Sequence, residues 1–338
     1  MTTTPDGLYQ FGGVPAGVNR LSEIFQAGNI WFVDYDGGNV GYDGKSPTSA
    51  KVGISAAVTA ASIGGIIYIK PRLSSTCEDN YYSDNITVPS TKSQLQFIGA
   101  GAGTIPGYRG AAQLRISSAT SHLFTIQASG VCIENLFLNG IGSGATYCSV
   151  NCVRNATYPG AVALQVRNCR FINGVATGGS DGTIVGGTIG LGSCQYSIIE
   201  DNLFEGCINS ITHWATYGSP QSMVVRRNIF SGLVSVRDVD ILIGMSDINS
   251  RGHIIADNIF ADGLPALSTG SWKRFIYDAY AATSVATGTI TRNAFATSTA
   301  DSMGTTGSQC ILAAGWFAAG NYYEGTSATG LSGFITKA

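Results

Sequence analysis

The chain has 338 residues and a formal net charge of −2, and charged residues make up only 12% of it, against about 25% in an average soluble domain. The few, dispersed Lys and Arg argue against a nucleic-acid-binding surface, and no apolar run reaches the roughly 18 residues that would insert in a membrane. With 45 Gly but also 14 Phe, 15 Tyr and 4 Trp, the composition is that of a folded, turn-rich chain.

Residues 1–28 show no repeat, and we interpret them as an extended N-terminal arm for attachment to a partner or for contact between subunits. Gly and Pro alternate there with apolar side chains that have no repeat partner, namely Tyr9, Phe11, Leu21, Ile24 and Phe25. The arm lacks the basic region and apolar core of a Sec-type signal peptide, so we expect the chain to fold in the cytoplasm in which it is made.

Residues 29–70 are predicted to form a first strand, a loop and a capping α-helix. The helix is expected over residues 46–62, with Ser46 or Ser49 as its N-cap. Its predicted apolar side consists of Val52, Ala56 and Ala60, with Val58 and Ile63 beside them. Because the following GGIIYIKP is typical of a strand, the helix should close the first coil of a solenoid.

The loop before this helix, DYDGGNVGYDG, contains three carboxylates: Asp34, Asp36 and Asp43. Hard oxygen ligands at such spacing can hold calcium, but the loop fits no EF-hand pattern. An Asx-rich turn is the favoured interpretation. We predict no metal and no cofactor.

A unit of about 30 residues recurs over residues 71–325, a period typical of solenoid proteins. Each copy is a short β-rich run that ends in an Asn: Asn135, Asn168, Asn202, Asn228, Asn258, Asn293 and Asn321. An aromatic residue follows two positions later in six copies and three positions later in one: Phe137, Phe171, Phe204, Phe230, Phe260, Phe295 and Tyr323. Residues 326–338 form a C-terminal tail too short for a domain.

The repeat predicts an all-β parallel β-helix. Asn tolerates the left-handed conformation of a sharp turn, and stacked Asn side chains can hydrogen-bond from coil to coil while the aromatic rings stack inside. The residues before each Asn alternate in charge, which predicts a structural salt ladder because neighbouring coils lie about 4.8 Å apart. These residues are Glu134, Arg167, Asp201, Arg227, Asp257 and Arg292.

The segment NIWFVDYDGGNVGYDGKSPTSAKVGISAAVTAASIGGIIYIKP resembles the N-terminal segment of pectate-lyase-like right-handed β-helix proteins. Proteins of this kind are common among bacteriophage tailspikes and other virion surface proteins, and they are typically homotrimers. The resemblance therefore implies a right-handed β-helix, a homotrimer, and a place on the virion surface after assembly in the host cytoplasm.

Motifs for catalysis are incomplete in this sequence. The polygalacturonase-type motifs are absent, the nearest being Gly252-His253, and no calcium-binding Asp cluster of the pectate-lyase kind is visible. The best pair of carboxylates is Asp238 and Asp240, joined by Asp247, although acids alternating along an outer strand face are usually solvated. An enzymatic role therefore stays open, with no complete catalytic set to support it.

Two aromatic-rich excursions between coils are candidate contact sites: Trp214, Tyr217, Trp272, Tyr277 and Tyr280. They suit either glycan binding or a subunit interface, and we favour the interface. The eight Cys contain no CxxC pair, so we expect buried free thiols, with a disulfide or a metal site as alternatives.

The function predicted from these features is that of a bacteriophage structural protein. A trimeric capsid decoration (cement) protein or a short spike suits the length, with major capsid or tail and baseplate proteins as partners and host polysaccharide as a further contact. The alternative is a tailspike depolymerase, a lyase or glycosidase whose active site lies between subunits. A cellular adhesin is disfavoured by the missing export signal.

Overall fold

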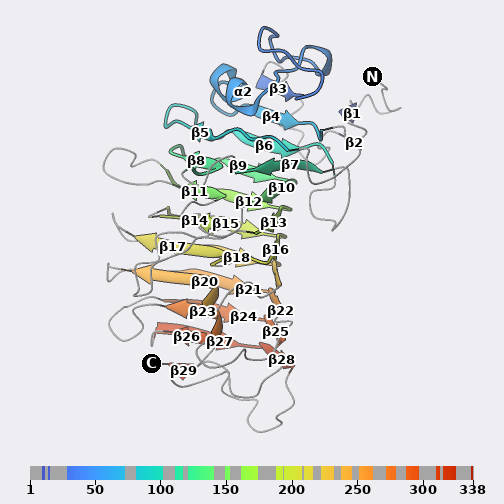
Figure 1. Ribbon diagram of the computed structural model, residues 1–338. Coiled ribbons are helices and arrows are strands. Elements are labelled where there is room, and N and C mark those ends of the chain that lie inside the picture. Colours follow the sequence, from blue (N-terminus) through green and yellow to red (C-terminus); the bar gives the residue numbers. More distant parts are fainter. Residues whose placement is uncertain are drawn as a thin grey trace.

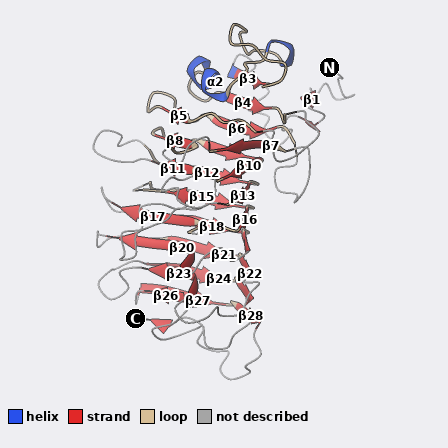
Figure 2. Cartoon of the chain, in the orientation of Figure 1, coloured by secondary structure: helices blue, strands red, loops and turns tan. Residues whose placement is uncertain are grey.

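The computed structural model describes residues 10–11, 14–15, 29–72, 81–101, 111–116, 121–140, 149–152, 161–173, 188–192, 194–207, 209–215, 222–231, 237–245, 251–261, 272–278, 287–296, 310–312, 315–324 and 336–337. Three long parallel sheets run side by side along one axis, and successive coils contribute one strand to each sheet (Figures 1 and 2). This confirms the predicted all-β parallel β-helix.

The ten-stranded sheet consists of β3 (Ile30–Val33), β4 (Ile66–Ile69), β6 (Gln96–Gly99), β9 (Cys132–Glu134), β12 (Gln165–Arg167), β15 (Ile198–Glu200), β18 (Val224–Arg226), β21 (His253–Ala256), β24 (Thr287–Thr291) and β27 (Gly315–Ala319). The eight-stranded sheet consists of β7 (Ala112–Arg115), β10 (Leu136–Asn139), β13 (Arg170–Ile172), β16 (Leu203–Glu205), β19 (Ile229–Ser231), β22 (Ile259–Ala261), β25 (Ala294–Ala296) and β28 (Tyr322–Glu324).

The nine-stranded sheet consists of β5 (Ile86–Val88), β8 (Phe124–Ile126), β11 (Val150–Cys152), β14 (Ile189–Gly190), β17 (Ile211–Ala215), β20 (Arg237–Met245), β23 (Trp272–Asp278), β26 (Cys310–Leu312) and β29 (Thr336–Lys337). A short antiparallel pair, β1 (Gln10–Phe11) and β2 (Val14–Pro15), lies within the N-terminal arm. No helix of the described residues is long and apolar enough to cross a membrane.

The first coil carries a shorter helix than the sequence predicts. A 3-10 turn, η2 (Pro47–Ser49), begins at Ser46, whose Oγ accepts the Ser49 N–H at 3.1 Å. The α-helix α2 (Ile54–Ala60) begins only after Gly53, which offers no side-chain cap. The cap comes instead from Asp84, whose Oδ2 accepts the N–H of Ile54 at 2.6 Å.

The predicted apolar side of the helix is wrong except for Val58. The buried residues are Ile54, Ala57, Val58 and Ala61, while Val52 and Ala56 are half-buried and Ala60 and Ile63 are exposed. Starting the helix later shifts the face that meets β3, β4 and β5, because neighbouring positions on a helix are rotated by about 100°. With this face buried, α2 lies at the N-terminal end of the stack (Figure 1).

The interior of the coils contains a continuous stack of aromatic rings. Each ring is parallel to the next within 9°, with centroids 4.8 to 4.9 Å apart: Phe171, Phe204, Phe230, Phe260 and Phe295. The first copy departs from the predicted pattern, because Leu138 and not Phe137 pairs with Phe171 in register. Phe137 faces outward, and the guanidinium of Arg170 lies 4.9 Å from its ring centroid.

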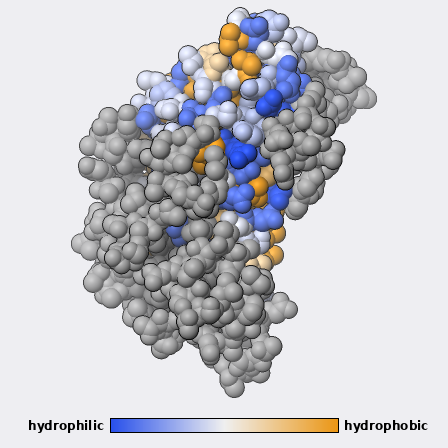
Figure 3. Space-filling view, viewed as in Figure 1, coloured by the Kyte–Doolittle hydropathy of each residue, from blue (hydrophilic) through white to orange (hydrophobic). Residues whose placement is uncertain are grey.

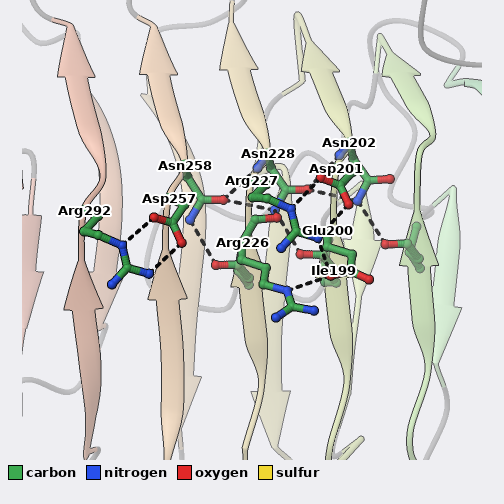
Figure 4. A network of polar contacts seen from close by, with 12 residues as sticks. Ile199, Glu200, Asp201, Asn202, Arg226, Arg227, Asn228, Asp257, Asn258 and Arg292 are labelled. Atoms are coloured by element: carbon green, nitrogen blue, oxygen red, sulfur yellow. Dashed lines mark hydrogen bonds and ion pairs between the residues drawn. The ribbon is translucent and has the colours of Figure 1, made fainter.

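The corner between the ten-stranded and eight-stranded sheets carries the Asn ladder. Nδ2 of each ladder Asn donates to Oδ1 of the next at 2.9 to 3.0 Å, along the series Asn202, Asn228, Asn258, Asn293 and Asn321. The same Oδ1 accepts the backbone N–H of the previous ladder Asn. Each side chain thereby ties together neighbouring coils (Figure 4).

Asn135 and Asn168 lie one row away from this ladder. They occupy the left-handed corner position, with φ of 58° and 50°, and the Nδ2 of Asn168 donates to Asn135 Oδ1 at 3.1 Å. In the later copies the residue before the Asn takes that conformation: Asp201, Arg227, Asp257 and Arg292. The corner residue points outward and the next residue points inward. The prediction that the ladder Asn itself takes the left-handed conformation is therefore wrong for the later copies: there the ladder Asn is the residue that follows the turn.

Candidate functional site

The outer surface around this corner is the best-described candidate for an interaction site. On the ten-stranded sheet, one outward row pairs in register from coil to coil: Ile198, Val224, Ile254, Thr289 and Phe317. On the eight-stranded sheet the matching outward row is Leu203, Ile229, Ile259, Ala294 and Tyr322. Both rows are uncharged.

Several large side chains in these rows are open to solvent. The exposed fractions are 41% for Ile229, 44% for Ile259 and 42% for Ile254. They rise to 62% for Phe317 and 69% for Tyr322 in the last described coil. In Figure 3 hydrophobic residues reach the surface along the right-hand edge, on the side where Figure 1 labels β13, β16 and β22. Contiguous exposed apolar side chains bordered by polar ones mark interaction surfaces more often than scattered ones do.

Ion pairs join neighbouring coils at this corner (Figure 4), at positions that lie between the two apolar rows in the sequence. The sequence predicted a single row of six alternating charges, but the structure divides these six residues between two rows. Glu134 and Arg167, 3.0 Å apart, lie at strand ends in one row, which continues through Glu200 and Arg226, 2.6 Å apart. The corner row holds two pairs at 2.7 Å: Asp201 with Arg227, and Asp257 with Arg292.

These pairs leave the corner close to neutral. The hydrogen bond from Arg292 lowers the pKa of Asp257 below its ordinary value, and the hydrogen bond to Asp201 raises the pKa of Arg227. The pKa shifts for Asp257 and Arg227 both favour the charged, paired form. Because these groups are largely exposed, each pair contributes little to stability, but together they leave little net charge between the two apolar rows.

The aromatic excursions predicted as contact sites are only partly described. Trp214 lies in β17, and Trp272 and Tyr277 lie in β23, all on the nine-stranded sheet with β20 between the two strands. Tyr217 and Tyr280 lie outside the described residues, as do Tyr9, Leu21, Ile24 and Phe25 of the arm, whereas Phe11 lies in β1. The proposed roles of these residues stay predictions.

The candidate catalytic carboxylates do not form a solvated pair. Asp240 is 2% exposed, in contrast to the solvated outer-face acid that the alternation predicts. Asp238 belongs to the same strand, β20, and Asp247 lies outside the described residues.

The acidic loop near the N-terminus is an Asx-rich turn, as favoured by the sequence. Asp34 Oδ1 accepts the N–H groups of Asp36 and Gly37, and its Oδ2 pairs with Lys70 at 2.5 Å. Asp43 accepts the Lys45 N–H at 2.9 Å, which lowers the pKa of its carboxyl. Each carboxylate is thus engaged by protein donors, and the described residues contain no His, Cys, Asp and Glu group suited to a metal.

Five cysteines are described in full, and all are buried thiols that form no disulfide: Cys132, Cys152, Cys169, Cys194 and Cys207. This confirms the free-thiol prediction for these five. Burial raises the pKa of the Cys169 thiol, so it is an unreactive core group.

The structure contains a buried histidine pair that the sequence pattern did not predict. His213 and His253 are fully buried in neighbouring coils, with ring centroids 5.3 Å apart and an edge-to-face arrangement, and Trp316 stacks on His253. Burial lowers the pKa of His213 to about 4 and that of His253 to about 3. The available signal was the position of both residues in apolar strand runs, ITHWA and HIIA.

No protein-family model matches this chain, and no curated protein matches its sequence. Among solved structures, an alginate lyase from Paenibacillus is 13% identical, with a TM-score of 0.44, covering 80% of this chain and 92% of its own. Escherichia coli YbhC is 12% identical, with a TM-score of 0.38, covering 88% of this chain and 77% of its own. At these scores neither neighbour informs the activity of this protein.

Proposed function

We propose that this protein is a structural component of a bacteriophage virion surface. In this proposal it is a homotrimeric β-helix that acts as a capsid decoration (cement) protein or short spike. It binds major capsid proteins or tail and baseplate proteins, and it stabilises the particle. The observation that carries the proposal is the combination of a ladder-bonded rod with two uncharged outward rows, one on the ten-stranded and one on the eight-stranded sheet.

The ladder supports a structural role because it makes the rod resistant to local opening. Every ladder Asn from Asn202 to Asn293 is hydrogen-bonded to the next coil through two bonds, one from its backbone N–H and one from its Nδ2. Opening one coil would leave these buried groups unpaired, at a cost of about 1 to 3 kcal/mol each. A particle-surface protein needs durability of this kind.

The chemistry of the described carboxylates also favours structure over catalysis. Asp34, Asp36 and Asp43 are engaged within the first coil, and the acids of the corner are paired with Arg. A glycosidase would need two carboxylates about 5 to 10 Å apart on an accessible face. Of the acids singled out from the sequence, those whose side chains the structure describes have other partners or are buried.

The N-terminal arm provides the test of attachment. Its apolar side chains forfeit roughly 1.5 to 3 kcal/mol each if they stay in water, so we expect them to dock on the particle or on a neighbouring subunit. Deleting residues 2–26 should leave the strand-type circular dichroism spectrum unchanged and abolish incorporation into particles, measured on pelleted virions. Normal incorporation of the shortened chain would place attachment elsewhere.

A second expected result separates this proposal from a depolymerase. Incubating the purified protein with surface polysaccharide of the host should yield no unsaturated products and no new reducing ends. A known polysaccharide lyase, run on its own substrate, serves as the positive control. Sustained turnover would overturn the structural role and support an active site between subunits.

A further inference from the structure

We infer that the outer face of the eight-stranded sheet at β19, β22 and β25 is the surface on which a second copy of this chain packs, parallel and in register. The inference rests on the homotrimer of the proposed function and assigns the contact to named residues. Phe230, Phe260 and Phe295 of these strands face the core, so their neighbours face outward.

The side chains on this face are apolar or small. Ile229 and Ile259 are directly adjacent in register, and each has more than two fifths of its surface exposed. Ala294 follows them in the next coil, and Ser231 and Ala261 form the second outward row. Small and β-branched side chains on a regular sheet make a flat surface that a second flat surface can approach closely.

Charge explains why the partner is a copy of the same chain. If the three-fold axis runs along this face, residues near the axis meet their own counterparts at the same coil level, so a charged row there would face like charges. The described outward residues of β19, β22 and β25 carry no charge. Beyond them, Glu205 of β16 is held by Arg170 at 2.6 Å. The adjacent corner charges are paired within the chain.

Other classes of partner fit this face poorly. A glycan is recognised by aromatic faces next to hydrogen-bonding groups, and a nucleic acid by clustered cations. The face of Ile229, Ile259, Ala294 and Ala261 supplies neither. A foreign protein with an apolar face is the remaining alternative, and a wild-type monomer in solution would favour it.

The test is the mass of the full-length protein in solution. Light scattering should give the wild type three times the chain mass of 35.1 kDa, and the double variant Ile229→Asp/Ile259→Asp one third of that value. Six carboxylates would then meet at two coil levels in a trimer. The matched control is Ile63→Asp, which introduces the same change at a site 59% exposed beside α2 and should stay trimeric.

A second variant covers the case in which the Asp variant misfolds. Ile259→Cys should form an intermolecular disulfide under mild oxidation, seen as a dimer band on a non-reducing gel, because identical positions face each other. Five of the eight native cysteines are described in full and buried, and wild type run in parallel shows any band formed by the other three, so the dimer band must be specific to the variant. Failure of the Ile259→Cys variant to crosslink would overturn the inference.

The outcomes separate this inference from the proposed function. A trimer that survives the double Asp substitution overturns the assignment of the face and leaves the virion proposal standing. A wild-type monomer overturns both the face and the homotrimer. A wild-type assembly of another size that the Asp variant dissolves supports the face and corrects the number of copies.

Discussion

Replacing Asn258 by Ala is expected to lower the free energy of unfolding by about 2 to 4 kcal/mol, since each buried polar group left without a partner costs about 1 to 3 kcal/mol. Asn258 is 1% exposed, and its Oδ1 accepts both the backbone N–H and the Nδ2 of Asn228 at 2.9 and 3.0 Å. Its Nδ2 donates to Val225 O and to Asn293 Oδ1. The truncation therefore strands groups in two neighbouring coils.

Urea unfolding followed by circular dichroism measures this loss. The matched comparison is Asn168→Gly, because Asn168 belongs to the same sequence pattern but is exposed, with φ of 50°. Glycine adopts this conformation without steric cost, so stability should stay within about 0.5 kcal/mol of wild type. Equal losses in the two variants would contradict the assignment of the two Asn to different rows.

The repeat made the fold predictable, but it did not determine the register of the first two copies. The run Leu136–Asn139 places apolar residues at three successive positions, so alternation alone does not decide whether Phe137 or Leu138 faces the core. The corner decides it: Asn135 takes the left-handed conformation, and Leu138 then falls in line with Phe171. That choice depends on contacts with the next coil, which a local pattern does not contain.

The start of α2 could not be predicted for a similar reason. Local sequence offers Ser46 and Ser49 as N-caps, and Ser46 does cap a 3-10 turn. The α-helix itself is capped by Asp84, which is 30 residues away from Ile54 in the chain. A cap supplied by the following coil leaves no local signature, so the predicted helix began too early and its buried face was misplaced.

The candidate interaction surface was present in the sequence but overlooked. In the copies at Asn228 and Asn258 an Ile stands between the Asn and the Phe. With Asn and Phe both facing inward, strand alternation places this Ile on the outer face. The outward positions of the repeat therefore predict that Ile229 and Ile259 form an exposed pair.

Acid is expected to destabilise this protein well before its carboxylates are protonated, because of the buried histidines. His213 Nε2 lies 3.1 Å from Cys194 O, and none of the described residues forms a hydrogen bond with its Nδ1. His253 Nδ1 accepts the Met223 N–H at 3.3 Å, which requires that nitrogen to be unprotonated. Both rings are therefore held neutral, and no described group is placed to accept a hydrogen bond from a second proton on His213.

The direction of the effect follows from the proton balance. In the folded protein the pKa of His213 is about 4 and that of His253 about 3, against an ordinary value of 6.5. At pH values between the folded-state pKa and 6.5, the unfolded chain binds more protons than the folded protein does. The free energy of unfolding therefore falls as the pH drops below about 6.5. For His213 alone the loss amounts to roughly 3 kcal/mol by pH 4, at about 1.4 kcal/mol per pKa unit.

The measurement is the free energy of unfolding from pH 8 to pH 5, where the pKa of Asp257, held low by Arg292, keeps that salt-ladder acid ionised. The variant His213→Phe keeps an aromatic ring against His253 and removes one titrating group. At pH 8 this variant should be about 1 kcal/mol less stable than wild type, because Cys194 O loses its hydrogen bond. Its free energy of unfolding should then fall by only about half as much as that of wild type between pH 8 and pH 5.

The control is the third histidine, His122, which is half-buried beside Asn151. The variant His122→Gln should show the same fall in the free energy of unfolding as wild type. A wild-type profile that is flat from pH 8 to pH 5 would contradict the burial of the pair, because only solvated rings can be protonated without loss of folding energy.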